Sequence, residues 1–196
     1  MALARFAVPK RRGDWLLGRW AGKRALVVSG LAAREEDAAV LASASGAPEA
    51  FVLGRPAGVS LSLTHSHGVA VAALGPAGTL LGVDLERVET RPAAFLADWF
   101  TEAEQAFVAA HEARPLAATL VWSAKEAVMK ALREGLRIPA KAVAVAPATG
   151  PADGAWRPFS ARGPCEESWS GWWRAEDARV LSAVSDPRSG PPERIG

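Results

Sequence analysis

The stretch LLGVDLERVE, residues 80–89, decides how the chain is interpreted, because it places carboxylates in an otherwise apolar run. Asp84 and Glu86 stand two positions apart, and in a β-strand such residues project from the same face. Like charges this close repel each other unless a cation lies between them. Mg²⁺ prefers oxygen ligands of this kind. The alternative is a solvated strand face with Leu85 turned inward, and a bare D-x-E pattern favours that alternative.

A second motif, WSAKEAVMKA at residues 122–131, adds a helix to the strand. Trp122, Glu126 and Lys130 are spaced four apart, so they lie along one face of a helix. We expect this helix to begin at Pro115 and to end before Gly135. It could supply a third carboxylate and a phosphate-binding ammonium group beside the strand. The alternative is an amphipathic helix with a Glu–Lys surface pair and a half-buried tryptophan.

A third motif, LTHSHG at residues 63–68, falls at the end of a predicted strand. Thr64, His65 and Ser66 carry hydroxyl and imidazole groups that can donate hydrogen bonds to phosphate. A structural role for a single histidine at a turn is the more frequent outcome.

Basic residues gather near the amino terminus, in PKRRGDWLLGRWAGKRAL at residues 9–26. This cluster indicates either a local anion site or a solvated helix face. The net charge of the chain is only +2, which is too small to argue for a nucleic-acid surface by itself.

Hydrophobic periodicity predicts an α+β chain of 196 residues in two similar-sized halves. Strands are expected around 59–88 and 141–185. Helices are expected at 12–26, 34–44, 92–100, 101–113 and 115–134, with a capping box formed by Thr101 and Glu104. Residues 147–164 are interpreted as a loop. We expect an N-terminal half at 1–91, a C-terminal half at 92–186 and a flexible tail at 187–196.

Cysteine usage and hydropathy favour a cytoplasmic protein. Cys165 is the only cysteine, so a disulfide framework or a thiolate metal site within the chain is excluded. There is no apolar run of about 18 residues and no signal-peptide core. We therefore expect neither a membrane nor a nucleic-acid partner.

Together the motifs resemble a known family. GVDLE at 82–86 and WSAKEAVMK at 122–130 resemble the two signature motifs of the 4′-phosphopantetheinyl transferases. GRP at 54–56, LSLTHSHG at 61–68 and WFTEAEQAF at 99–107 resemble further segments of these enzymes, with Arg55, Ser62 and Thr64 departing from the usual residues. The length is similar to that of the larger, monomeric, pseudo-dimeric type that activates peptide and polyketide synthases.

The resemblance implies two α/β halves related by a pseudo-two-fold axis, with coenzyme A in the cleft between them. It implies transfer of the 4′-phosphopantetheine arm to a serine of an acyl or peptidyl carrier protein, with release of 3′,5′-ADP. Asp84, Glu86 and Glu126 would bind Mg²⁺, or Mn²⁺ in its place. Lys130 would contact a phosphate, and Glu126 is the candidate general base.

Other roles follow from the same resemblance. Arg19, Lys23 and Arg55 would meet the 3′-phosphate of coenzyme A, and Thr64 and His65 would bind that phosphate or the diphosphate. Lys125 would contact a phosphate or pair with an acid of the other half. Glu104 would be either a further group near the metal or the capping residue. Candidates for carrier contact, which are equally good core residues, are Phe95, Trp99, Phe100 and Phe107.

Two other interpretations stay open. One is a coenzyme-A-binding paralogue without catalysis, for which the departures at Ser62 and Thr64 leave room. The other is a nucleic-acid-binding module built on the basic amino-terminal helix.

Overall fold

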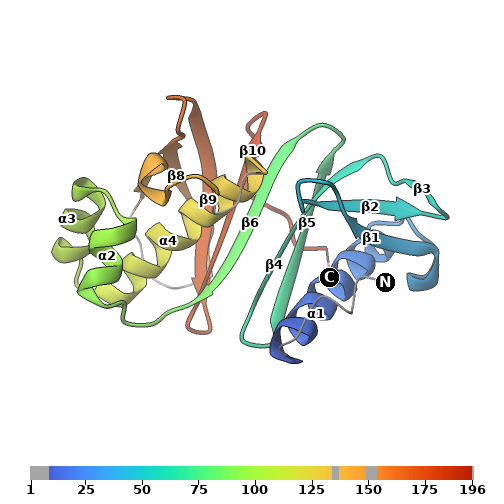
Figure 1. The fold of residues 1–196 in the computed structure, drawn as a ribbon, viewed down its shortest axis with the longest axis horizontal. Helices are drawn as coiled ribbons and strands as arrows, with labels where there is room; N and C mark the ends of the chain where they lie inside the picture. The colour runs from blue at the N-terminus through green and yellow to red at the C-terminus, as the bar shows by residue number, and fades with distance from the viewer. Residues whose placement is uncertain (1–8, 134–136, 149–153, 196) are drawn as a thin grey trace.

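The computed structural model describes residues 9–133, 137–148 and 154–195 (Figure 1). These residues form a mixed fold of sheets and helices, as the sequence predicts. A long helix, α1 (Pro9–Val28), is followed by six strands, three helices and four further strands. The predicted helix at 12–26 is therefore confirmed, and the observed helix extends beyond it at both ends.

The first strands form a small antiparallel sheet with the order β1–β2–β3. These strands are β1 (Ala38–Ala42), β2 (Pro48–Val52) and β3 (Arg55–Pro56). The helix predicted at 34–44 is wrong, because only Glu35–Asp37 form a short 3₁₀ turn before β1 begins. Ala38 and Val40 alternate into the core, and this cross-strand burial outweighs the helix propensity of the alanines.

A hairpin follows the small sheet and packs against α1. It consists of β4 (Val59–Ser66) and β5 (Val69–Pro76), joined at His67 and Gly68. Both turn residues have positive φ, 48° and 78°, as a tight hairpin turn requires. The predicted turn at THSHG is therefore confirmed.

The C-terminal region begins with three helices, α2 (Ala93–Trp99), α3 (Glu102–Ala110) and α4 (Arg114–Ala131). The expected capping box is present at the start of α3. A 3₁₀ turn at Ala140–Ala142 and the strands β7 (Ala144–Pro147), β8 (Arg157–Arg162), β9 (Ser168–Glu176) and β10 (Arg179–Asp186) complete the chain. The loop predicted at 147–164 was wrong for β8, whose alternating burial places Phe159 and Ala161 in the core.

The largest sheet is antiparallel and has the order β6–β10–β9–β8–β7. Strand β6 (Leu80–Arg87) comes from the middle of the chain but pairs with β10, so that Asp84 lies opposite Ser182. Helix α4 crosses this sheet (Figure 1).

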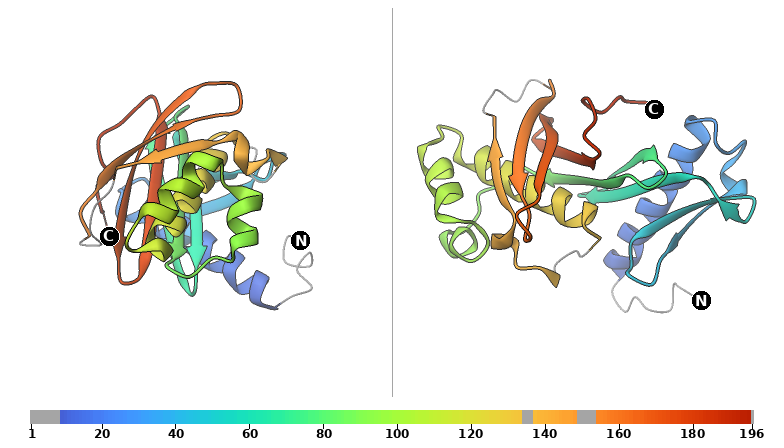
Figure 2. Two further views of the ribbon diagram at one scale, coloured as in Figure 1. Left: turned by 90° about the vertical axis from the view of Figure 1, so that its left-hand side faces the viewer. Right: turned by 90° about the horizontal axis from the view of Figure 1, so that it is seen from above.

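Two separate hydrophobic cores lie in the molecule. The first is built from buried residues of α1, β1, β2 and β4, which extend from Leu26 to Leu61 in the sequence. The second is built from the helices α2 to α4 and the sheet that α4 covers. The β4–β5 hairpin belongs to the first core, through Leu61, and β6 lies between this hairpin and the rest of the large sheet (Figure 1, Figure 2). The pseudo-two-fold relation between the halves stays a prediction.

Among the described residues, no helix is long and apolar enough to cross a membrane.

Candidate active site

The glycine of the GVDLE motif allows α4 to approach β6 closely. A Cβ atom added at Gly82 would lie 1.8 Å from the backbone oxygen of Ala127. No side chain fits there, so a glycine at this position lets the helix backbone rest directly on the strand. This contact brings the helix motif at 122–130 alongside Asp84 and Glu86.

Two side chains of α4 fix the helix to β6 on either side of this contact. The Ser123 hydroxyl donates a hydrogen bond to the backbone oxygen of Asp84 at 3.2 Å. Farther along the helix, Lys130 Nζ donates to the backbone oxygen of Val83 at 3.1 Å and to Asp84 Oδ1 at 2.7 Å. The expected juxtaposition of strand motif and helix motif is thus present in the structure.

Strand β4 joins the other side of β6 through side chains. Ser62 Oγ accepts a hydrogen bond from the Val83 amide, and Thr64 Oγ1 accepts one from the Leu85 amide, both at 3.0 Å. Thr64 Oγ1 also donates to Asp84 Oδ1 at 3.2 Å. Both hydroxyls are buried, and Thr64 Oγ1 orients Asp84, while its contact with a phosphate stays a prediction.

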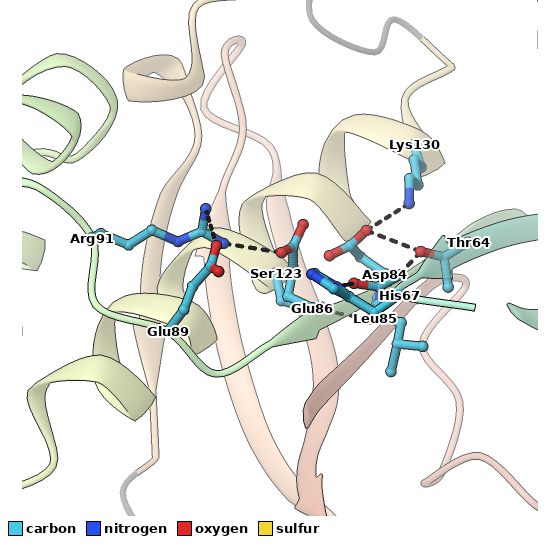
Figure 3. Close-up of polar contacts among 10 residues, drawn as sticks. Thr64, His67, Asp84, Leu85, Glu86, Glu89, Arg91, Ser123 and Lys130 are labelled. Atoms are coloured by element: carbon cyan, nitrogen blue, oxygen red, sulfur yellow. Dashed lines mark hydrogen bonds and ion pairs between the residues drawn. The ribbon is translucent and has the colours of Figure 1, made fainter. Parts of the chain in front are cut away.

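Asp84 is the central acid of the site (Figure 3). Its side chain is 5% exposed, and Oδ1 accepts from Lys130 and Thr64. Its other oxygen, Oδ2, is buried without a hydrogen-bond partner among the described residues. A buried carboxylate oxygen normally has a donor or a cation, so Oδ2 is available for a positive ligand.

Glu86 projects on the same side of β6 as Asp84, as the strand periodicity predicts (Figure 3). Its Oε2 accepts a hydrogen bond from Arg91 at 2.9 Å. Burial, and secondarily the charge of Asp84, raise the pKa of Glu86, while Arg91 and Lys130 act in the opposite direction.

Glu126 completes the acidic group from α4. Burial raises its pKa to about 7, and the charges of Asp84 and Glu86 add to this effect while Lys130 opposes it. The three acids therefore lie close enough for each to feel the others. Among the described residues, however, no three His, Cys, Asp or Glu side chains are arranged as a ready metal-binding group.

The residues nevertheless suit a hard divalent cation. The available atoms are carboxylate oxygens, and one of them is the buried, unpartnered Oδ2 of Asp84. Mg²⁺ is commonly held by one or two carboxylates, with water and phosphate oxygens filling the remaining positions. Glu89 also contacts Arg91, so four acids face Lys130 and Arg91 and leave two net negative charges when all are ionised, which favours a further cation.

Lys125 and Glu104 lie elsewhere, in the core of the C-terminal region. Their side chains are 0% and 2% exposed and form an ion pair at 2.8 Å. Lys125 Nζ also donates to the backbone oxygens of Ala140 and Val143. The expectation that Lys125 contacts the cofactor is therefore corrected, because its ammonium group is enclosed by protein partners. Of the two roles open for Glu104, the structure supports the capping one.

A cavity of about 360 Å³ collects part of the expected cofactor-binding set. Arg19 and His65 both line it, together with Trp15, whose ring lies 4.3 Å from the Arg19 guanidinium carbon. Arg19 Nε is buried with no hydrogen-bond partner among the described residues, and desolvation lowers the pKa of Arg19. A buried donor in a cavity is suited to an anionic ligand.

A second cavity, of about 230 Å³, lies beside Lys130 and is also lined by Arg133. Gly46, Pro48 and Leu63 line both cavities, so the two adjoin. Lys23 and Arg55 line neither of them. The Lys23 ammonium group donates to the backbone oxygen of Glu35, and Arg55 is exposed on β3.

Sequence reasoning missed Arg91, which contacts Glu86, and Arg133, which lies near Lys130. Both fall outside the motifs, and neither has a spacing that links it to an acid or a phosphate site. The aromatic candidates for carrier contact belong to the core, with Phe100 fully buried and Phe95, Trp99 and Phe107 packed against it. Trp122 packs with Phe95 and Trp99, with ring centroids 5.1 and 5.5 Å away.

Two family models match the chain, one ending in β5 and the other starting at β6. The model of the 4′-phosphopantetheinyl transferase superfamily matches residues 80–171, and the model of the 4′-phosphopantetheinyl transferase N-terminal domain matches residues 1–75. The chain belongs to this superfamily. None of the curated proteins compared with the chain matches it.

Membership in the 4′-phosphopantetheinyl transferase superfamily gives the acidic group a chemical context. The family uses coenzyme A as substrate and typically a divalent metal. In this transferase the acids, Lys130 and the Thr64–Asp84 contact all lie within the region where β4, β6 and α4 meet, beside the two adjoining cavities.

Proposed function

We propose that this transferase moves the 4′-phosphopantetheine arm of coenzyme A onto a serine hydroxyl of an acyl or peptidyl carrier protein, in a magnesium-dependent reaction. The serine oxygen bonds to the phosphorus of the arm, the diphosphate P–O bond breaks, and 3′,5′-ADP leaves. The serine proton passes to a carboxylate or to water. The observation that carries the proposal is the unpartnered, buried Oδ2 of Asp84 beside Glu86, Glu126 and Lys130.

The residues of the chain supply mainly charge and position. Phosphoryl transfer needs the negative charge of the diphosphate to be neutralised and the nucleophile to be aligned. Mg²⁺ held by Asp84, Glu86 and Glu126 would neutralise part of that charge. Lys130, whose side chain is 27% exposed, can turn from Asp84 toward a phosphate oxygen. Arg19 and His65 would hold the 3′-phosphate in the neighbouring cavity.

Glu126 is the proposed general base for the carrier serine, acting directly or through a water molecule. A base works best when its pKa lies near the working pH. Burial and the neighbouring acids raise the pKa of Glu126 to about 7, well above that of an exposed glutamate. A metal ion bound to Glu126 would lower this pKa again and weaken the base, which favours passage of the serine proton through a water molecule.

The test is incubation of the protein with coenzyme A, Mg²⁺ and a panel of apo-carrier proteins, followed by intact-mass measurement. We expect one carrier or more to gain the mass of one phosphopantetheine arm. EDTA should stop the reaction, and added Mg²⁺ or Mn²⁺ should restore it.

D84N is the key variant, because it keeps the shape of the side chain and removes its charge. We expect transfer to fall at least about a thousandfold, which corresponds to about 4 kcal/mol of barrier, with an unchanged circular-dichroism spectrum. Full transfer by D84N, or in the chelator, would contradict the metal role. Binding of coenzyme A without transfer to any carrier would favour the non-catalytic alternative.

A further inference from the structure

Arg91 lies in the segment between β6 and α2 and contacts the acidic group from the side opposite Lys130. One of its amino groups, Nη2, is 2.9 Å from Glu86 Oε2, and the other, Nη1, is 3.1 Å from Glu89 Oε1. The guanidinium carbon lies 5.1 Å from the centre of the Phe95 ring. The side chain of Arg91 is only 14% exposed, so these three contacts fix its position.

The two carboxylates of β6 are anchored in the same manner. Asp84 uses Oδ1 for Lys130 and Thr64, and its Oδ2 is buried without a partner among the described residues. Glu86 uses Oε2 for Arg91, and its side chain is partly exposed, which leaves Oε1 accessible to a ligand. Figure 3 shows Lys130 beyond Asp84 and Arg91 beyond Glu86, with the other carboxylate oxygens between these cations. Each cation thus orients one acid and leaves one oxygen toward the middle.

The contacts of Arg91 argue against a role as a temporary substitute for a metal. A substitute would have to leave Glu86 when the metal arrives. Arg91 is held by Glu89 and by the face of Phe95 independently of Glu86, and a metal can bind the accessible oxygen Oε1 while Oε2 stays with Arg91. A glutamate on three rotatable bonds, 25% exposed, would otherwise sample several orientations.

We propose that Arg91 is a positioning residue for the metal site, which orients Glu86 so that one carboxylate oxygen faces Asp84 and accepts a divalent cation. This inference rests on the metal role in the proposed function. Partners that orient metal ligands typically change metal affinity 10- to 100-fold when they are removed.

The experiment measures Mn²⁺ binding by the free protein, without coenzyme A or carrier, from the electron paramagnetic resonance signal of unbound Mn²⁺. We expect R91M to bind Mn²⁺ roughly tenfold more weakly than the wild type, or weaker still. R91K keeps a cation next to Glu86 and should recover most of the affinity. R91Q replaces R91M if the latter melts near the assay temperature.

R87M is the matched control, because Arg87 also follows Glu86 closely and carries the same charge but makes no contact with that glutamate among the described residues. We expect its Mn²⁺ affinity to stay within about twofold of the wild type. A double-mutant cycle adds a sharper test. In the E86Q background, R91M should change the affinity by less than about twofold, because the residue that Arg91 orients has already lost its charge.

The outcomes separate this inference from the proposed function. Equal or tighter Mn²⁺ binding by R91M overturns the inference alone and would mean that Arg91 competes with the metal. A further large loss on adding R91M to E86Q also overturns it. Absence of Mn²⁺ binding by the wild type overturns the metal role itself, and the inference with it.

Discussion

Helix α4 contributes two lysines to two ion pairs of nearly equal length, and these pairs differ in the exposure of the lysine and in how completely the acid is hydrogen-bonded. Lys125 is 2.8 Å from Glu104, and Lys130 is 2.7 Å from Asp84. In the first pair every polar group has a partner. Glu104 accepts from the amides of Thr101 and Val145, and Lys125 donates to two backbone oxygens besides. In the second pair, Asp84 Oδ2 has no partner among the described residues and Lys130 is partly exposed.

The difference separates a structural charge pair from a functional one. Buried charges are stable when every hydrogen-bonding group is satisfied, as for Lys125 and Glu104, which tie α4, α3 and β7 together. An acid that keeps an unpartnered oxygen destabilises the ligand-free protein. Binding of a cation to that oxygen recovers the lost free energy. Burial lowers the pKa of Lys125, and Glu104 acts against that shift, so the pair depends on both members.

The largest effect should come from breaking the fully satisfied pair. K125M leaves Glu104 charged and unpaired in the core, which should lower the free energy of unfolding by about 4 kcal/mol. K130M is the same substitution five residues later, at a partly exposed position. It should cost about 2 kcal/mol, because Asp84 loses the Lys130 donor but keeps the hydrogen bond from Thr64, while nearly abolishing transfer. Urea unfolding followed by tryptophan fluorescence measures the stability of both variants, and the intact-mass assay measures transfer. A K130M protein less stable than K125M would contradict the distinction between the two ion pairs.

The second largest effect should come from separating α4 from β6. In G82A the new methyl group would overlap the backbone of Ala127, so the helix must shift. We expect a loss of about 3 kcal/mol in stability and a large loss of transfer, because Lys130 moves away from Asp84. G75A is the control, since a Cβ there would meet its nearest atom, of Leu81, at 3.6 Å, which is ordinary contact. Equal melting temperatures for the two variants would contradict the close-packing argument.

The same comparison explains what the sequence could and could not predict. The strand at GVDLE, the helix at WSAKEAVMK and the turn at THSHG have strong local periodicity or turn chemistry, and all three are confirmed. The strand β1 was predicted as helix because its alanine-rich segment carries no local signal for pairing with β2. Spacing along the helix placed Glu126 and Lys130 correctly on one face.

Lys125 and Thr64 show why the remaining site assignments needed the structure. One position along a helix turns a side chain by about 100°, and for Lys125 this leads into the core instead of the site. Thr64 has the chemistry to bind phosphate, and in the structure its hydroxyl contacts Asp84 and the Leu85 amide. Both outcomes depend on packing between distant segments, which motif spacing does not encode.

A third effect concerns pH, and it tests the crowding of acids around Asp84. The pKa of Glu126 is raised to about 7 in the folded protein, so folding favours its protonated form. This stabilisation is present below the unfolded pKa near 4.5 and is lost as pH rises through about 7. In a chelator, the wild-type free energy of unfolding should therefore fall between pH 5 and pH 8, by on the order of 2 kcal/mol.

E126Q should remove most of that pH dependence, because glutamine does not titrate. A smaller slope of the same sign should remain, since the pKa of Glu86 is also raised. Urea titrations at several pH values give the measurement, with E112Q as an exposed control far from the acidic group in sequence. An unchanged slope in E126Q would mean that Glu126 is not part of the acidic group.

The smallest effect should distinguish the two hydroxyls through which β4 contacts β6. T64V and S62A each leave a buried β6 amide, of Leu85 or Val83, without its acceptor, at a cost of about 1 kcal/mol. Only Thr64 also donates to Asp84, so only T64V should lower the transfer rate and Mn²⁺ affinity, by about tenfold. T64S keeps the hydroxyl and should restore both. Equal losses of transfer in T64V and S62A would mean that β4 acts on the site only by holding β6 in place.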